Sequence, residues 1–588
     1  MLIANRGTPQ MVYGANRFLK RRSWWHVATI GSLCLMPGCG SGTTDNGDSG
    51  SIKTQSAAIG SPQVQLRKLT RNAITQSVPQ LDIPVVDQMP NLPAHGVDMN
   101  WAQKAADYDS LVMNSQNGML TTTNQGYPSI PAYYEGSVSD NQAISILPTI
   151  LGRYLINKDN SNYAGAFSQF YQASAANGGN GALLYLNNVG SSGGSFWYAI
   201  MAGYYSIALT AAYNGKYGID PWGSLYSTAN RWCDAGWYLS NTYAHEGFDF
   251  IKNVAIDGDH VEPDAPGGIA WIQYQAYLHF PNEIHFLNAA KTNISILEAY
   301  SQNPNYEGPV MNLAAYTAAR LNAEQGQNFD MQKIVNWVFQ SAQPGGNNAG
   351  IHVGKYGDEE INGLSGGSAA NRGFSMNTYA PILGLLPMVR YDLRFATAVG
   401  KYLLNVATNA RLFYTEFLSD AYEDLPGQVP PIPYESLDHS FTTAQNITYQ
   451  PYGRGDAVIN GWAPTDRALY GGALAAVIGG TSALTNNTEV LQWDLLKLDF
   501  QHTDTYPTYL YYNPYPSSVW INYAAGNTPV DLYELTTHTF LQRNVTGTPN
   551  FLVPAGAAYV VVVLPANSTV STNANSQSLV NGKIIAYQ

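Results

Sequence analysis

Charge is scarce in this chain. Asp, Glu, Lys and Arg make up 12% of its 588 residues, about half the roughly 25% that is usual in globular proteins. Lys and Arg number 29 against 41 Asp and Glu, so the formal net charge is −12. Binding to nucleic acid requires clustered basic residues, and we therefore expect no nucleic-acid partner.

Cysteine is scarcer still, with three residues in the whole chain. Cys34 and Cys39 lie in the N-terminal leader, which leaves Cys233 for the rest. This excludes a disulfide framework and a zinc site built from CxxC pairs. The sequence also lacks a Walker loop, an HExxH helix and a GxGxxG turn after a strand. We expect no cofactor, apart from a calcium alternative considered below.

No segment after the leader reaches the roughly 18 apolar residues that a membrane-spanning helix needs. In the leader, a basic cluster at Lys20, Arg21 and Arg22 precedes an apolar run that ends at Cys39, as in an export signal. The segment "LMPGCG" resembles a bacterial lipoprotein cleavage box, and the resemblance implies that Cys39 carries the lipid. We therefore expect a signal peptide at 1–39. The exported protein would lie in the cell envelope, in the periplasm or at the outer membrane, and meet the membrane only through this anchor.

Aromatic side chains are abundant, with 41 Tyr, 12 Trp and 18 Phe. A chain of this length, 45% of it hydrophobic, can bury a sizeable core. Aromatic rings pack on apolar C–H surfaces while Tyr hydroxyls and Trp N–H groups form hydrogen bonds. The composition therefore favours a neutral, hydroxyl-rich ligand, although core packing accounts for most of the rings.

Helical patterns dominate the segment 99–488, which follows a flexible linker and N-terminal extension at 40–98. The segment 284–303 has apolar residues at helical spacing, and 196–218 is apolar nearly all round, which predicts a buried inner helix. Further helices are predicted at 144–157, 160–175, 223–242, 268–280, 309–325, 330–341, 377–389, 391–410 and 465–478. Without strong strands between them, these helices exclude a doubly wound α/β fold.

The pattern changes in the last hundred residues. Runs rich in Tyr and Val alternate with turn residues, and "AAYVVVVLPA" predicts a buried strand. Asn581 and Gly582 are typical of a hairpin turn. We expect a small all-β domain at 489–588, a sandwich packed on the helical body.

This domain order resembles the six-hairpin enzymes, in which an (α/α)6 toroid of helical hairpins precedes a β-sandwich. The resemblance rests on helix number, aromatic content and domain order over roughly 100–588. It implies a mainly α fold: an (α/α)6 toroid followed by a small, sandwich-like C-terminal domain. It also implies an activity on carbohydrate, as a glycoside hydrolase or a polysaccharide lyase.

The first candidate site is the loop "DGDHVEPDAPGG" at 257–268. Asp259 and Glu262 can supply one of the two carboxylates that glycosidic cleavage needs. Asp257 and Asp264 can instead hold Ca²⁺ through oxygen ligands. In a third interpretation the carboxylates only stabilise the start of the following helix or face solvent.

A second candidate is the long Gly- and Ser-rich loop at 354–381. Asn371, Arg372 and Tyr379 suit substrate binding, or lyase chemistry in which a cation or amide neutralises a uronate and Tyr removes a proton. The alternative is a solvated loop without a role.

The third candidate, 430–472, interleaves acids with aromatic rings. Glu435 and Asp456 have no capping role to explain them, so each is a candidate catalytic carboxylate. Trp462 and Tyr470 flank them as candidate sugar-binding rings. We expect some of the four rings Trp271, Tyr379, Trp462 and Tyr470 to line one concave face.

These observations favour a monomeric glycoside hydrolase of the cell envelope that cleaves a poly- or oligosaccharide, with inversion, by two carboxylates from different loops. One carboxylate would come from 257–264 and the other would be Glu435 or Asp456. A polysaccharide lyase that uses Tyr379, Arg372 and Asn371 is the alternative on the same fold. The alternative outside the enzymes is a surface lipoprotein that binds glycan without catalysis.

Overall fold

The structure, a computed structural model, describes residues 77–123, 125–137, 142–177, 179–306, 308–340, 350–366, 372–426 and 430–587. These residues belong to one compact unit, 67–588. The predicted signal peptide, Cys39 and Asn371 lie outside the described residues. Within the described ranges, no helix combines the length and the hydropathy needed to cross a membrane.

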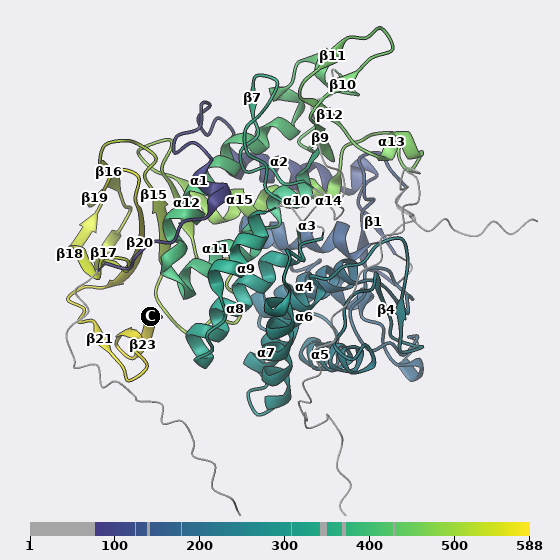
Figure 1. Cartoon of the computed structure of the whole chain (residues 1–588), viewed down its shortest axis with the longest axis horizontal. Helices are drawn as coiled ribbons and strands as arrows, with labels where there is room; N and C mark the ends of the chain where they lie inside the picture. Colours follow the sequence, from purple (N-terminus) through teal and green to yellow (C-terminus); the bar gives the residue numbers. More distant parts are fainter. Residues whose placement is uncertain are drawn as a thin grey trace, which may run out of the picture. The chain divides into compact units, whose positions relative to one another are not determined.

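Helices form the body of this unit, at the positions that the apolar patterns predict in most cases (Figure 1). Their bounds are α1 Pro84–Asp87, α2 Trp101–Val112, α3 Ala143–Leu155, α4 Phe196–Ala212, α5 Pro221–Tyr238, α6 Ala265–His279, α7 Ile284–Ala299, α8 Met311–Gln325, α9 Met331–Phe339, α10 Ser375–Tyr379, α11 Ile382–Tyr391, α12 Ala396–Asn409, α13 Ala457–Asn460, α14 Leu469–Ala473 and α15 Ala475–Thr481.

Three helix predictions need correction. The predicted helix 465–478 begins only at Leu469 and is two helices, α14 and α15. The predicted helix 160–175 is wrong, because only a 3₁₀ turn forms at Ala166–Phe170 and Tyr171 then turns extended to bridge Tyr185. The predicted helix 377–389 is two helices, α10 and α11. It breaks before Pro381, whose ring fits the start of a helix but not its interior.

Contacts among the buried helices run in a closed cycle, α3–α4–α6–α8–α11–α15–α3. Helix α4 is buried nearly all round, which confirms the prediction of an inner helix in 196–218. Helix α6 approaches its neighbours closely through two glycines. A Cβ on Gly267 would lie 2.5 Å from Ala314 Cβ, and one on Gly268 would lie 2.4 Å from Ile200 Cγ2. The remaining long helices, α2, α5, α7, α9 and α12, contact members of this cycle.

Short strands in the connections between helices carry the candidate site residues. One three-stranded sheet joins β3 (Gly193–Ser195), β4 (Gly247–Asp249) and β5 (Val254–Ile256). Another joins β8 (Arg372–Phe374), β9 (Ser436–Asp438) and β12 (Tyr452–Arg454). Two-stranded hairpins complete the set: β1 Thr121–Thr122 with β2 Pro128–Ser129, β6 Lys355–Tyr356 with β7 Glu359–Glu360, and β10 Phe441–Thr442 with β11 Thr448–Tyr449.

The C-terminal region is rich in sheet, as the Tyr- and Val-rich runs predict. A six-stranded antiparallel sheet has the order β13-β14-β15-β20-β17-β18, and two smaller sheets are β16-β19 and β21-β22-β23. The strand bounds are β13 Ser482–Leu484, β14 Leu491–Asp494, β15 Thr508–Tyr512, β16 Val519–Asn522, β17 Gly526–Glu534, β18 Thr539–Gly547, β19 Asn550–Val553, β20 Ala558–Pro565, β21 Ser571–Thr572, β22 Ser578–Val580 and β23 Lys583–Ala586.

The valine run forms β20, a buried strand between β15 and β17. Asn581 and Gly582 turn the chain between β22 and β23 with φ of 50° and 78°, which confirms the hairpin. Strands β15 and β20 contact α12. On the same large sheet, Tyr511, Leu532 and Val561 share an apolar cluster with side chains of β16 and β19. The sheet therefore packs between helix α12 and a second, two-stranded layer.

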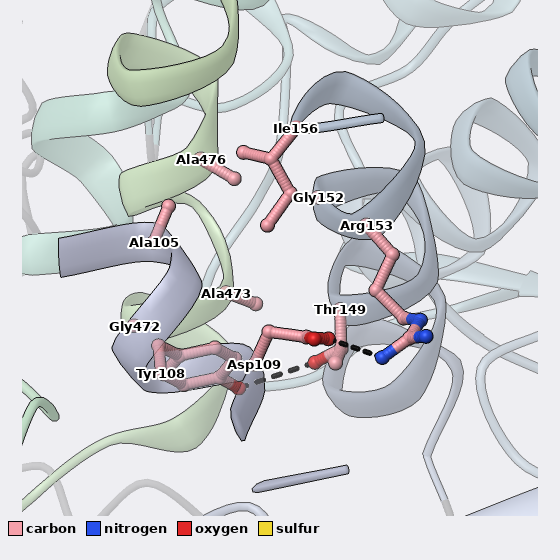
Figure 2. Close-up of a pocket in the computed structure, with 10 residues that line it drawn as sticks. All are labelled: Ala105, Tyr108, Asp109, Thr149, Gly152, Arg153, Ile156, Gly472, Ala473 and Ala476. Carbon is pink, nitrogen blue, oxygen red and sulfur yellow. Dashed lines mark hydrogen bonds and ion pairs between the residues drawn. The ribbon is translucent and has the colours of Figure 1, made fainter. Parts of the chain in front are cut away.

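A small cavity lies among α2, α3, α14 and α15 (Figure 2). Its volume of about 10 Å³ is close to what a single water needs. The Tyr108 hydroxyl hydrogen-bonds Thr149 Oγ1 at 3.1 Å on its wall, and Arg153 pairs with Asp109. This cavity cannot hold a sugar.

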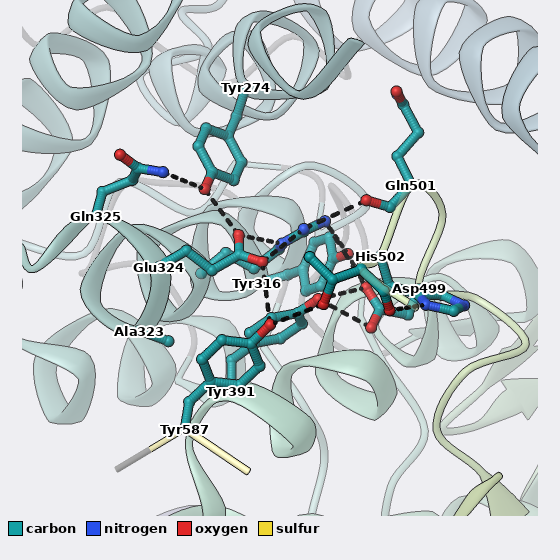
Figure 3. Close-up of polar contacts among 12 residues, drawn as sticks. Tyr274, Tyr316, Ala323, Glu324, Gln325, Tyr391, Asp499, Gln501, His502 and Tyr587 are labelled. Atoms are coloured by element: carbon teal, nitrogen blue, oxygen red, sulfur yellow. Dashed lines mark hydrogen bonds and ion pairs between the residues drawn. The ribbon is translucent and has the colours of Figure 1, made fainter. Parts of the chain in front are cut away.

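A buried ionic network joins the helices to the C-terminal region (Figure 3). Asp499 accepts a 2.9 Å hydrogen bond from Arg390 Nη1, and its other oxygen lies 3.8 Å from Arg320 Nη1. The hydroxyls of Tyr316 and Tyr391 donate to the same carboxylate. All of these side chains are buried. Arg320 also pairs with Glu324 at 2.9 Å, so the loss of Asp499 would chiefly leave the charge of Arg390 uncompensated.

Candidate functional site

Two antiparallel strands bring Glu435 and Asp456 together. Ser436 of β9 lies opposite Arg454 of β12, so Glu435, which precedes β9, reaches the turn that leads from β12 into α13. Gly455 makes this approach possible, because a Cβ there would lie 2.6 Å from Glu435 Oε2. Residues 21 positions apart in the chain are thereby adjacent.

Glu435 is 1% exposed, and its carboxyl group is enclosed by neutral donors. Oε1 accepts a 2.8 Å hydrogen bond from the Tyr133 hydroxyl and another from the Tyr470 hydroxyl. Oε2 accepts a 2.6 Å hydrogen bond from the backbone N–H of Asp456. Burial raises the pKa of the Glu435 carboxyl, and the negative charge of Asp456 raises it further.

Asp456 differs because a cation holds its carboxylate. Arg372 Nη1 donates to Asp456 Oδ1 at 2.7 Å, its Nε donates to Asp438 Oδ1 at 2.5 Å, and its Nη2 donates to Ser436 Oγ at 2.6 Å. Arg372 and Asp438 face each other directly across the β8–β9 pair. Arg454 Nε lies 3.6 Å from the other oxygen of Asp438. Two guanidinium groups therefore balance Asp438 and Asp456, and Glu435 is the acid of this cluster without an ion pair.

Aromatic rings surround the Glu435 carboxyl. The rings of Tyr133 and Tyr470 meet edge to face with centroids 5.7 Å apart. Both belong to a small apolar cluster against which Trp462 and Met376 pack, partly exposed. Trp462 and Tyr470 thus lie at the acid site, as the sequence predicts. Tyr133 was missed, because "PAYYEG" is far away in the chain, and a backbone bridge from Tyr133 to Ala468 brings it there.

In the acidic loop, Glu262 is buried and contacts the start of helix α4. Its Oε2 accepts a 2.7 Å hydrogen bond from the backbone N–H of Trp197, and its Oε1 accepts one from Ser195 Oγ. His260 Nε2 lies 3.1 Å from the same Oε1, and its ring stacks on Tyr306. Burial raises the pKa of Glu262, while these donors oppose the shift. A carboxylate at a helix N-terminus is also favoured by the helix dipole.

The other acids of this loop lie in different surroundings. Asp264 is buried and accepts a 3.1 Å hydrogen bond from the backbone N–H of Tyr306, and burial raises its pKa to about 7. Asp257 is exposed and lies 2.6 Å from His245 Nδ1, and Asp259 is exposed. Among the described residues, no group of three or more His, Cys, Asp or Glu side chains is arranged to hold a metal ion.

Trp197 and Tyr198 connect the acidic loop to the Glu435 cluster. The backbone of Trp197 donates to Glu262, and its ring stacks on Tyr198 with centroids 3.8 Å apart. The Tyr198 phenol in turn interacts electrostatically with Tyr133, which donates to Glu435.

Of the four rings, some of which were expected on a concave face, Trp462 is partly exposed and the other three, Tyr470 at 8% exposed among them, are buried. Trp271 is 1% exposed and packs against Tyr204 inside the helical body. Tyr379 is 0% exposed and meets Trp101 edge to face. Both follow an acid- or Gly-rich loop in sequence, but each lies inside a buried helix, where packing decides its position. This corrects the expectation that they face an open surface.

The chain has distant structural similarity to several solved proteins. No family model and no curated protein matches the chain. A solved family 76 glycoside hydrolase (mannosidase) from Bacteroides thetaiotaomicron is 11% identical, covering 65% of this chain and 97% of its own, with a TM-score of 0.38. A cellobiose 2-epimerase from Bacillus thermoamylovorans is 9% identical, covering 64% and 98%, with a TM-score of 0.36. Function is therefore argued from the residues of the site.

Proposed function

We propose that this protein is a carbohydrate-active enzyme. It is a glycoside hydrolase that cleaves a poly- or oligosaccharide and uses Glu435 and Asp456 as its catalytic carboxylates. One observation carries the proposal: a buried carboxyl group with a raised pKa lies next to a second carboxylate that an arginine holds. We further propose that the closed cycle of buried helices is the inner ring of an (α/α)6 toroid.

The two carboxyl groups have surroundings that suit opposite roles. Burial and the negative charge of Asp456 favour the protonated form of Glu435, as a general acid requires, while its three hydrogen-bond donors oppose this shift. Arg372 pairs with Asp456 and holds its carboxylate in place, as suits a group that activates water or attacks the sugar. Because Glu435 is enclosed, its proton passes to the hydroxyl oxygen of Tyr133 or Tyr470 while that hydroxyl releases its own proton to the substrate.

The aromatic surroundings support a sugar as the substrate. Trp462, which is partly exposed, offers an apolar face to sugar C–H groups and packs beside the buried rings of Tyr133 and Tyr470. Arg372 and Arg454 are both engaged with carboxylates, which favours a neutral substrate over a polyanion.

Two alternatives stay distinguishable from this proposal. A lyase requires a Tyr base at the substrate, yet Tyr379 lies in the core, and all three donor-bearing nitrogens of Arg372 contact protein groups. A binding protein without catalysis would use the same aromatic cluster, with the acids serving only to hold the loops.

The direct test is turnover by the full chain on a panel of neutral poly- and oligosaccharides and on polygalacturonate. We expect new reducing ends from a neutral glycan, without the ultraviolet absorbance of an unsaturated uronate. Unsaturated product from polygalacturonate would establish the lyase. Saturable binding without any product would establish the binding protein.

We also propose that the protein is exported, monomeric, without a cofactor and anchored in the cell envelope through a lipid on Cys39. Cells that express the chain should incorporate labelled palmitate into it, and Cys39→Ala should abolish the label. A Cys39→Ala protein that is still labelled would rule out this anchor.

A further inference from the structure

The two-stranded sheet β16–β19 presents one flat face outward. Strand register places Trp520 opposite Leu552 and Asn522 opposite Asn550. The alternate residues of both strands, Ile521, Phe551 and Val553, point inward and are buried against the large sheet. The four outward residues, which we call the Trp520 face, therefore form a regular patch on the side of the sandwich away from the helices (Figure 1).

The Trp520 face combines exposed apolar groups with amides. Trp520 is 56% exposed and Leu552 is 40% exposed, while both asparagines are exposed. Apolar area in water is unfavourable, and an exposed indole next to polar groups is typical of a binding residue. None of the four residues carries a formal charge.

Both edges of this small sheet are already paired. Asn486 Oδ1 accepts a 2.7 Å hydrogen bond from the backbone N–H of Asn522, and its Nδ2 donates to the Trp520 carbonyl at 2.9 Å. Gln542 Nε2 donates to the Asn550 carbonyl at 2.8 Å on the other strand. Strand addition, by a peptide or by a second copy of the chain, would have to displace these side chains. A ligand is therefore more easily accepted on the face than at an edge.

We propose that the Trp520 face is a binding site for an uncharged polysaccharide chain, separate from the catalytic site. A sugar ring stacks on the Trp520 indole with its C–H face, and Leu552 extends the apolar contact across the strand pair. Asn522 and Asn550 each offer an amide donor and acceptor, the groups that pair with sugar hydroxyls. The absence of charge on the face matches a neutral polymer and disfavours a polyanion, a phosphorylated ligand or an anionic membrane. The site holds the polymer and performs no step of its cleavage.

Affinity electrophoresis of the full chain tests this site. The gels contain soluble mannan, xylan or laminarin as neutral probes, and polygalacturonate as the charged comparison. We expect at least one neutral probe to retard the chain. Trp520→Ala should weaken that binding by about tenfold or more, and Trp520→Phe should retain most of it. The matched control is Trp237→Ala, which removes a 73% exposed indole from helix α5.

Each result decides the proposal. Equal retardation of Trp520→Ala and Trp237→Ala, or no retardation by any neutral probe, would overturn it. So would a monomer–dimer shift on Trp520→Ala, because the face would then be an interface between two copies. Turnover of a short soluble oligosaccharide should be unchanged in Trp520→Ala. Its loss in that variant would also overturn the separate site, whereas an inactive but glycan-retarded wild type would contradict only the proposed hydrolase.

Discussion

The backbone N–H of Asp456 donates a 2.6 Å hydrogen bond to Oε2 of Glu435. This bond fixes the two acids of the proposed site at the junction of β9, β12 and α13, where Gly455 leaves room for them. The position of Asp456 relative to Glu435 thus depends on the strand register and on Arg372, which spans β8 and the α13 turn.

Arg372→Lys tests this dependence. A lysine ammonium cannot reproduce the fork that contacts Asp438, Asp456 and Ser436 together. We expect kcat to fall by about ten- to a hundredfold through misplacement of Asp456. Arg394→Lys is the control, since Arg394 pairs only locally with Asp392 and is exposed. Similar kcat values for the two variants would show that Arg372 does not position Asp456 for catalysis.

Glu262→Gln tests whether Glu262 holds the acidic loop to the start of helix α4 or takes part in catalysis. The carboxylate accepts hydrogen bonds from Trp197 N–H and Ser195 Oγ, and an amide nitrogen cannot accept one of them. The mispaired donor should cost about 1–3 kcal/mol of unfolding free energy, measured by urea denaturation, with kcat per folded molecule nearly unchanged. A hundredfold loss of kcat at unchanged stability would instead make Glu262 the second catalytic carboxylate.

The raised pKa of Asp264 predicts that the stability of the protein depends on pH. An unfolded Asp ionises near pH 4, whereas the pKa of folded Asp264 is raised to about 7 by burial. The contribution of Asp264 to the free energy of unfolding is therefore full below about pH 4 and is lost as the pH rises through about 7. The melting temperature of Asp264→Asn should decline less between these values than that of the wild type. Asp259→Asn, an exposed neighbour, should follow the wild-type curve; identical curves for all three would refute the assignment.

Asp499→Asn should destabilise the packing of the helices against the C-terminal region. It leaves the buried guanidinium groups of Arg320 and Arg390 without their shared carboxylate. We expect a loss of about 3–5 kcal/mol in unfolding free energy. Asp504→Asn, which removes an exposed partner of Lys583, should leave it nearly unchanged. Equal stability of both variants would show that the buried network is dispensable.

Local patterns in the sequence predicted most of the fold. The apolar surface of 196–218, the valine run of β20 and the Asn581–Gly582 turn each specify their element from neighbouring residues alone. Strand β18 was missed, since its exposed polar residues weaken the alternation. Strand β19 was missed because it has only four residues, one of them an exposed leucine.

The site was predicted only in part, because its members meet through long-range pairing. Acids among aromatic residues pointed to Glu435, Asp456, Trp462 and Tyr470. Nothing near Tyr133 in the sequence indicates that it donates to Glu435, a residue 302 positions away. Burial of Trp271 is likewise decided by how α6 packs against α4.

The most direct test of the proposed hydrolase is kcat of Glu435→Gln on the glycan that the wild type cleaves. Glutamine keeps the shape of the side chain but cannot donate the acid proton. Asp531→Asn is the control, a buried carboxylate of β17 with several hydrogen bonds of its own, far from the site in the fold. We predict that Glu435→Gln lowers kcat by at least about a hundredfold while Asp531→Asn retains kcat per folded molecule. A folded Glu435→Gln protein with wild-type kcat would contradict the assignment of Glu435 as the general acid.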